Sequence, residues 1–141
     1  LIRKFHESKT AGADQVVVWG TGRPRREFLH VDDMADACAF VMNLDDATAT
    51  EAFFSYPRPC FVNVGTGTDS TIGELAAMIK DVVGYTGKIV FDASKPDGTP
   101  QKLLDVSRLQ GMGWRASIDL AEGVSRTYRW FQEALARGRL G

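Results

Sequence analysis

Two glycine-containing turns are the first candidates for chemistry, because Gly-x-Gly loops that follow strands can bind phosphate. The runs WGTG at 19–22 and VGTG at 64–67 each follow a β-branched stretch. A dinucleotide-binding loop carries a third glycine, but Ser70 stands at that position after the second run. The first run continues into Arg23 and Pro24 and does not open a helix. We therefore interpret both as tight turns, and the P-loop pattern is absent.

An arginine cluster follows the first turn and could bind an anion. Arg23 and Arg25 are expected to lie on a solvated face, whereas Arg26 adjoins an apolar run and its neighbour Glu27 could orient it. A planar guanidinium with five donors suits bidentate contacts to a diphosphate. Trp19 offers a flat wall for a base or a sugar ring. Arg26 is thus a candidate phosphate ligand, with a purely solvated role as the alternative.

The loop at 95–102, with the sequence KPDGTPQK, is a second unusual segment. Two prolines and a glycine restrict its path, and it presents Lys95, Asp97 and Lys102. A carboxylate on a stiff loop suits a purine with adjacent N–H donors, and lysines suit phosphate. The alternative is an ordinary surface turn.

Metal binding and nucleophilic catalysis are not indicated. His6 and His30 are far apart, and neither lies at metal-ligand spacing from another His or a Cys. No serine or threonine is marked as an activated nucleophile. We interpret His30 as a structural histidine, and the pairs Asp32-Asp33 and 45–46 as helix caps and solvated charges.

The composition indicates one soluble globular domain. The chain has 141 residues, 44% hydrophobic and 25% charged, with a formal net charge of -1. This balance disfavours nucleic-acid binding, and no apolar run approaches a membrane span. Cys38 and Cys60 lie among apolar neighbours, which predicts buried free thiols and a reducing cytoplasm. The chain begins without Met in what reads as a helix, so we expect a fragment.

Strands and helices alternate along the chain, which predicts an α/β fold. Strands are expected at 15–19, 26–31, 61–64 and 88–91, and surface loops at 45–59 and 92–105. Helices are expected at 1–11, after residue 32, from a capping box at 71–74 to a stop at Gly84, and after residue 119. The predicted apolar faces consist of Met34, Cys38, Val41 and Met42 in the second helix, and of Leu120, Val124, Tyr128, Phe131 and Leu135 in the last.

Three runs together resemble the extended short-chain dehydrogenase/reductases. They are REFLHVDDMA at 26–35, NVGTG at 63–67, and KPDGTP at 95–100 with LLD at 103–105. Within these enzymes, the chain resembles the GDP-L-fucose synthase family along essentially its whole length. Many nucleotide-sugar epimerases and dehydratases share the first run in looser form, whereas the 92–105 segment is more particular to this family.

The resemblance implies the C-terminal substrate-binding part of an enzyme of the NAD(P)-binding Rossmann superfamily, without its cofactor half. The implied reaction converts GDP-4-keto-6-deoxy-D-mannose to GDP-L-fucose by 3,5-epimerisation and NADPH-dependent 4-reduction. The NADP motif and the catalytic residues would lie upstream, so residues 1–141 alone are expected to be inactive. Residues 32 to about 65 are expected to pack back on the Rossmann domain. Without it, an exposed helix face and strand edge would favour homodimers or self-association.

The resemblance assigns substrate binding to Lys4, Trp19, Arg26, Asp97 and Lys102. Lys4 stands where family members carry Arg or Lys. Two alternatives remain: another nucleotide-sugar 4-epimerase or 4,6-dehydratase, and a non-enzymatic nucleotide-sugar-binding module.

Overall fold

The computed structural model describes residues 1–140, which form two compact units. The first unit consists of Leu1–Arg26, Ser70–Lys102 and the chain from Leu120 onward. The second consists of Glu27–Asp69 and Leu103–Asp119. Helices and a parallel strand pair confirm the predicted α/β class. Within the described residues, no helix is both long and apolar enough to span a bilayer.

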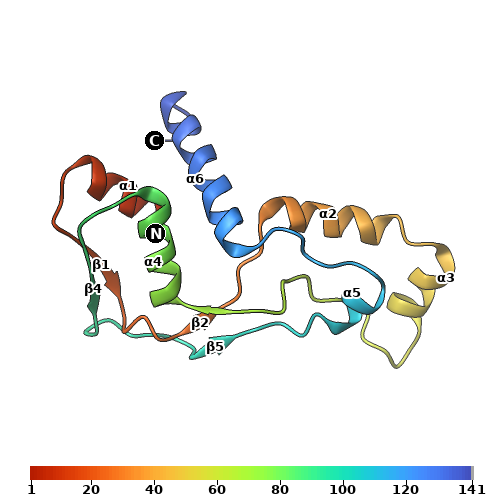
Figure 1. The fold of residues 1–141 in the computed structure, drawn as a ribbon. Helices are drawn as coiled ribbons and strands as arrows, with labels where there is room; N and C mark the ends of the chain where they lie inside the picture. Colours follow the sequence, from red (N-terminus) through yellow and green to blue (C-terminus); the bar gives the residue numbers. More distant parts are fainter. Residues whose placement is uncertain (141) are drawn as a thin grey trace. The chain divides into compact units, whose positions relative to one another are not determined.

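The first unit contains a parallel pair of strands, β1 (Gln15–Trp19) and β4 (Lys88–Asp92) (Figure 1). Both strands were predicted, and Trp19 lies opposite Asp92 at the end of the pair. Val16 and Val18 are buried while their neighbours are more exposed, which is the period-two pattern of a strand with one covered face.

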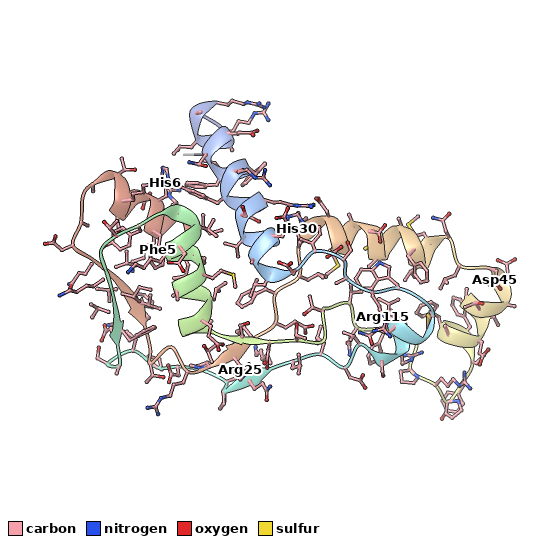
Figure 2. All side chains as sticks on the ribbon, viewed as in Figure 1. Phe5, His6, Arg25, His30, Asp45 and Arg115 are labelled. Carbon is pink, nitrogen blue, oxygen red and sulfur yellow. The ribbon has the colours of Figure 1, made fainter. Side chains whose placement is uncertain are left out.

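Three helices complete the core of this unit: α1 (Ile2–Thr10), α4 (Ile72–Val83) and α6 (Leu120–Ala136). The predicted capping box and the left-handed stop at Gly84 are both present on α4. On α6 most of the predicted stripe is buried, although Leu135 is exposed. Phe5, labelled in Figure 2, is fully buried. The larger buried side chains of the unit are Phe5, Val16, Val18, Leu75, Ile79, Val83, Tyr85, Val124, Tyr128 and Phe131.

A second small sheet in this unit positions the candidate phosphate ligands. The central strand β2 (Arg25–Arg26) pairs antiparallel with β3 (Ser70–Thr71) and parallel with β5 (Gln101–Lys102). The predicted strand at 26–31 is therefore wrong in extent. The chain leaves the ladder at Glu27, because that side chain bonds to other backbone segments and His30 already caps a helix. The predicted loop at 92–105 contains β5.

The second unit is built on α2 (Val31–Met42) and α5 (Ser107–Gly111), around Ala37, Leu109 and Trp114. The predicted strand at 61–64 is wrong, since no ladder includes it within residues 1–140. Val62 and Val64 instead pack against the buried cluster. The predicted loop at 45–59 is partly helical, with α3 (Asp46–Ala49), capped by Asp45 as expected, and the π-helix η1 (Thr50–Phe54).

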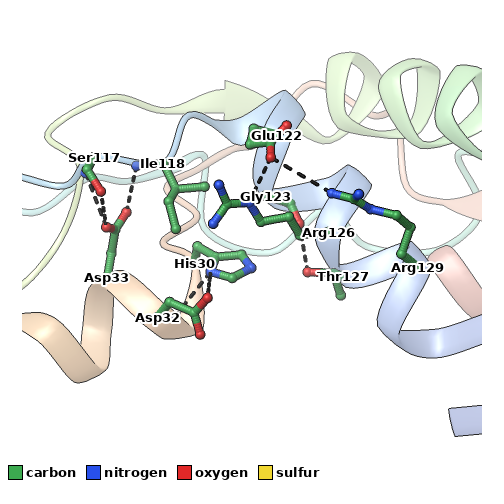
Figure 3. Close-up of polar contacts among 10 residues, drawn as sticks. All are labelled: His30, Asp32, Asp33, Ser117, Ile118, Glu122, Gly123, Arg126, Thr127 and Arg129. Atoms are coloured by element: carbon green, nitrogen blue, oxygen red, sulfur yellow. Dashed lines mark hydrogen bonds and ion pairs between the residues drawn. The ribbon is translucent and has the colours of Figure 1, made fainter. Parts of the chain in front are cut away.

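The start of α2 differs from the prediction. His30 is the cap, and its Nδ1 accepts a hydrogen bond from the Asp32 N–H at 3.2 Å (Figure 3). This confirms a structural role for His30. Asp33 is not a cap: its carboxylate is buried and accepts hydrogen bonds from Ser117 and Ile118.

The buried face of α2 therefore differs from the predicted one. Asp33 and Ala37 point inward, while Met34 and Met42 are 42% and 85% exposed. Cys38 is also exposed, as is Cys60. Both thiols are free, as expected, but the prediction that they are buried is wrong.

Candidate functional site

All five residues assigned to substrate binding lie in the first unit. Lys4 comes from α1, Trp19 from the end of β1, Arg26 from β2 and Lys102 from β5. Asp97 lies in the connection between β4 and β5. Ends of paired strands and one connecting loop therefore present most of the candidate site.

Trp19 provides the exposed flat surface that its sequence position predicted. Its side chain is 71% exposed, although the neighbouring Val18 is buried. The Lys95 ammonium nitrogen lies 5.9 Å from the centroid of the Trp19 ring, within the range of a cation–π interaction. The aromatic wall thus already carries a cation from the 95–102 loop.

Asp97 is held by the turn that follows β1. Its carboxylate accepts hydrogen bonds from the Thr21 N–H and the Thr21 hydroxyl, both at 2.6 Å. The Thr21 hydroxyl, then the Thr21 N–H, lower the pKa of Asp97 against a smaller opposing effect of desolvation, and Arg23 lowers it further. An ionised carboxylate has about four acceptor positions, so the exposed Asp97 can still accept bonds from a ligand.

Backbone pairing places Arg26 next to Lys102, its register partner in β5. The Arg26 Nη1 donates to the carbonyl of Arg25 at 2.6 Å. The Glu27 carboxylate makes other contacts, accepting from the Gly67 N–H at 2.6 Å and the Leu104 N–H at 3.0 Å. The suggestion that Glu27 orients Arg26 is therefore not supported.

Lys4 is connected to β1 and not to the loop. Its ammonium donates to the backbone carbonyl of Val17, two residues before Trp19. An ammonium has three donors, so this bond leaves two for a ligand.

Neither glycine turn fits the diphosphate of a dinucleotide, because protein carboxylates already occupy both. A Cβ on Gly65 would lie 2.4 Å from the Glu27 carboxylate, and a Cβ on Gly20 would lie 2.3 Å from that of Asp97. These carboxylates accept the Gly67 and Thr21 amides that a phosphate would need, and their charge would repel it. These contacts agree with the interpretation of both glycine runs as bends of the chain that do not bind a phosphate.

The structure adds Thr21 and Lys95 to the residues that shape the site, and it gives Glu27 a role inside the second unit. The sequence contained a signal only for Lys95, which lies in the unusual loop. Thr21 bonds to Asp97, which lies 76 residues later in the chain, and Glu27 bonds to Leu104, which lies 77 residues later. No local sequence pattern marks such contacts.

A separate hollow of about 320 Å³ lies between α1 and the end of α6. Its lining is mostly apolar and contains none of the five candidate residues; it consists of Arg3, His6, Glu7, Thr10, Ala11, Phe131, Leu135 and Leu140. His6, labelled in Figure 2, also contacts the Tyr128 hydroxyl at 3.1 Å. Among residues 1–140, no group of three His, Cys, Asp or Glu side chains could hold a metal ion.

Comparison with known proteins agrees with this architecture. Residues 1–55 match the model of the NAD dependent epimerase/dehydratase family. The chain is 55% identical to GDP-L-fucose synthase of Escherichia coli (strain K12) over 141 residues, which is 99% of this chain and 43% of that protein. The chain spans 37 to 43% of the length of the curated relatives that it matches at 51 to 55% identity.

Solved structures share the fold. A GDP-6-OMe-4-keto-L-xylo-heptose reductase from C. jejuni superposes with a TM-score of 0.83 and 32% identity, over 94% of this chain and 46% of that chain. A GDP-L-fucose synthetase from Naegleria fowleri bound to NADP gives 0.77 and 25%, over 96% and 39%. The resemblance inferred from the sequence is confirmed: the chain is similar in sequence to GDP-L-fucose synthases over nearly all of its own residues, and residues 1–55 match the NAD dependent epimerase/dehydratase family.

Proposed function

We propose that this chain is the GDP-sugar-binding part of a GDP-L-fucose synthase, an enzyme that converts GDP-4-keto-6-deoxy-D-mannose to GDP-L-fucose. The observation that carries the proposal is the presence in one unit of an exposed indole, a fixed carboxylate and two paired cations. A nucleoside diphosphate presents matching groups, namely a flat base, N–H donors and a dianionic diphosphate.

Each candidate residue has a distinct role in this proposal. Arg26 and Lys102 bind the diphosphate, with the planar guanidinium making the bidentate contact. Trp19 supplies the flat wall, and Asp97 accepts N–H bonds from the purine. Lys4 adds a cation from α1.

The contribution of these contacts to catalysis is placement of the hexose. Binding energy from the nucleotide, which does not react, holds the sugar ring in the geometry that the chemical steps require. Epimerisation at C3 and C5 removes protons next to the C4 carbonyl, so it needs a base, an acid and a group that stabilises the oxyanion.

In this proposal, the residues that bind NADP and the groups that transfer protons lie in the part of the full-length relatives that this chain does not span. The Naegleria fowleri relative is bound to NADP, while the glycine turns described above are filled by carboxylates. The reduced cofactor, NADPH, would supply the hydride for reduction at C4 and leave as NADP. The two free thiols support a cytoplasmic setting.

The test is isothermal titration of GDP, UDP and dTDP into the chain and into Arg26→Ala and Asp97→Ala. GDP is expected to bind more tightly than UDP or dTDP, and each substitution is expected to weaken GDP binding about tenfold or more, since bonds to charged groups contribute about 1.5–3 kcal/mol. Arg115→Ala is the matched control, because Arg115 is an exposed arginine in the second unit.

Each alternative has its own outcome. A preference for UDP or dTDP would indicate another nucleotide-sugar epimerase or dehydratase. GDP binding that neither substitution changes would refute the site assignment. A third experiment fuses this chain to the part of a relative that it does not span and supplies NADPH and the keto-sugar nucleotide. If the fusion shows no turnover, a binding module without catalysis is favoured.

A further inference from the structure

The loop between β4 and β5 is fixed to the protein at three places. At its start, the Asp92 carboxylate accepts from the Ser94 N–H at 3.0 Å and from the Ser94 hydroxyl at 2.6 Å. At its end, the Pro100 carbonyl accepts from the Arg25 N–H at 2.8 Å. In the middle, Thr21 donates both hydrogen bonds that Asp97 accepts. The loop therefore depends on Thr21 at the position farthest from its ends.

Gly20 is shaped for this contact. Its φ of 84° lies in the left-handed region that favours glycine, and a Cβ there would lie 2.3 Å from the Asp97 carboxylate. The adjacent Gly20 N–H donates to the Asp92 carbonyl at 2.9 Å. The turn after β1 thus leaves room for the Asp97 side chain. It also bonds to Asp92, the residue at which the loop begins.

The same fixed loop brings Lys95 over the exposed indole of Trp19. Trp19 stands two residues before Thr21 in the chain. A lysine side chain is flexible, so its position depends on where the backbone of its loop is held. If the loop moved away from the end of β1, both Lys95 and Asp97 would leave the Trp19 wall.

We propose that Thr21 is a positioning residue for nucleotide binding, whose hydroxyl holds the 93–100 loop so that Lys95 and Asp97 stand beside Trp19. This inference rests on the proposed function for its ligand, but the contact itself exists without ligand. The Thr21 hydroxyl contributes most to the lowered pKa of Asp97, which keeps the carboxylate charged and its bonds to Thr21 strong. Arg23 is the charged side chain that acts on Asp97 in the same direction.

The test compares Thr21→Val with Thr21→Ser in the full chain. Valine matches threonine in shape and keeps the backbone N–H donor, so this change removes only the hydroxyl. Serine retains the hydroxyl and should restore the contact. Thr127→Val is the matched control, because it removes a threonine hydroxyl on α6, where Thr127 donates to the Gly123 carbonyl at 2.7 Å (Figure 3).

The first measurement is hydrogen–deuterium exchange of peptides covering 93–102 in the protein without ligand. Thr21→Val is expected to speed exchange in this segment about tenfold, whereas Thr21→Ser and Thr127→Val stay close to the unmodified protein. Peptides covering α4 should exchange equally in all four proteins, which shows that the fold is retained. Equal exchange at 93–102 in all four would overturn the proposal.

The second measurement is titration with GDP. Thr21→Val is expected to bind GDP about tenfold more weakly, with recovery in Thr21→Ser. Faster loop exchange with unchanged GDP affinity would overturn the positioning role. If the unmodified chain does not bind GDP, the proposed function fails, whereas the exchange measurement still decides whether Thr21 holds the loop.

Discussion

Arg26 and Lys102 are register partners in the parallel pairing of β2 with β5. Strand pairing brings partner backbones to roughly 4.8 Å, so two cations far apart in the sequence become neighbours. Side chains of partners project from the same face of a sheet. Two like charges held in this way repel each other, and an anion bound between them removes the repulsion. The short sheet therefore places two cations side by side, as the proposed binding of one anionic group requires.

This relationship predicts that the two cations act jointly on GDP. Arg26→Gln and Lys102→Gln should each weaken GDP binding about tenfold. The change in binding free energy of the double variant should differ from the sum of the two single changes by roughly 0.5–3 kcal/mol. Titrations at low and moderate salt should show a smaller salt dependence in each variant than in the unmodified chain. Lys88→Gln, an exposed lysine on β4, is the control. Unaltered salt dependence in the variants would contradict the shared anion.

Glu27 is predicted to stabilise the second unit by joining residues 66–67 to Leu104. Glu27→Ala removes the acceptor for the Gly67 and Leu104 N–H groups, and should lower the free energy of unfolding by about 1–3 kcal/mol. Urea unfolding followed by circular dichroism measures this change.

Gly65 offers a sharper test of the same contact. A Cβ on Gly65 would lie 2.4 Å from the Glu27 carboxylate, so Gly65→Ala should displace that carboxylate and destabilise the protein by a similar amount. In the Glu27→Ala background the carboxylate is absent, so Gly65→Ala should change the free energy of unfolding only slightly. If Gly65→Ala is equally costly in both backgrounds, the steric explanation is wrong.

Asp33 should make stability depend on pH in the acid range. Burial raises the pKa of Asp33, but hydrogen bonds from the Ile118 N–H and from the Ser117 hydroxyl and N–H, together with the charge of His30, lower it overall (Figure 3). A carboxylate whose folded-state pKa lies below its unfolded value of 3.8 contributes stability at higher pH. That stability is lost as the pH falls through the folded-state pKa.

The measurement compares the unmodified chain with Asp33→Asn between pH 7 and pH 3. The variant should be less stable by about 2–3 kcal/mol at neutral pH, because its amide would face N–H donors. The difference in the free energy of unfolding between the two proteins should remain constant above roughly pH 5 and become smaller below roughly pH 4. Asp14→Asn, at an exposed aspartate, is the control for the substitution itself. A constant difference down to pH 3 would contradict the assignment.

The outward face of α2 is predicted to drive self-association. Val31, Met34, Cys38 and Met42 are all exposed, and their spacing places them along one side of the helix. Analytical ultracentrifugation should show concentration-dependent association that Met34→Lys with Met42→Lys reduces. Trp130→Lys, at an exposed apolar residue on α6, is the control. A monomer at all concentrations would refute this prediction.

The sequence by itself determined the features that depend on near neighbours. The capping box of Thr71 and Glu74, the stop at Gly84 and the strands at 15–19 and 88–92 follow from local hydrogen bonding and side-chain periodicity. The motif runs also predicted the similarity to GDP-L-fucose synthases, which the sequence comparison confirms over nearly all of this chain.

Tertiary structure alone decided the features that depend on partners far along the chain. Asp33 resembled a helix cap, but it is a buried acceptor for Ser117, 84 residues away, and it lies with Ala37 on the buried face of α2. Cys38 lies on the exposed side of the same helix although its neighbours are apolar. The strand expected at 26–31 ended at Arg26, because Glu27 bonds to Gly67 and Leu104. A polar side chain can cap, pair or remain solvated with similar free energy, so its role is set by the donors that folding brings to it.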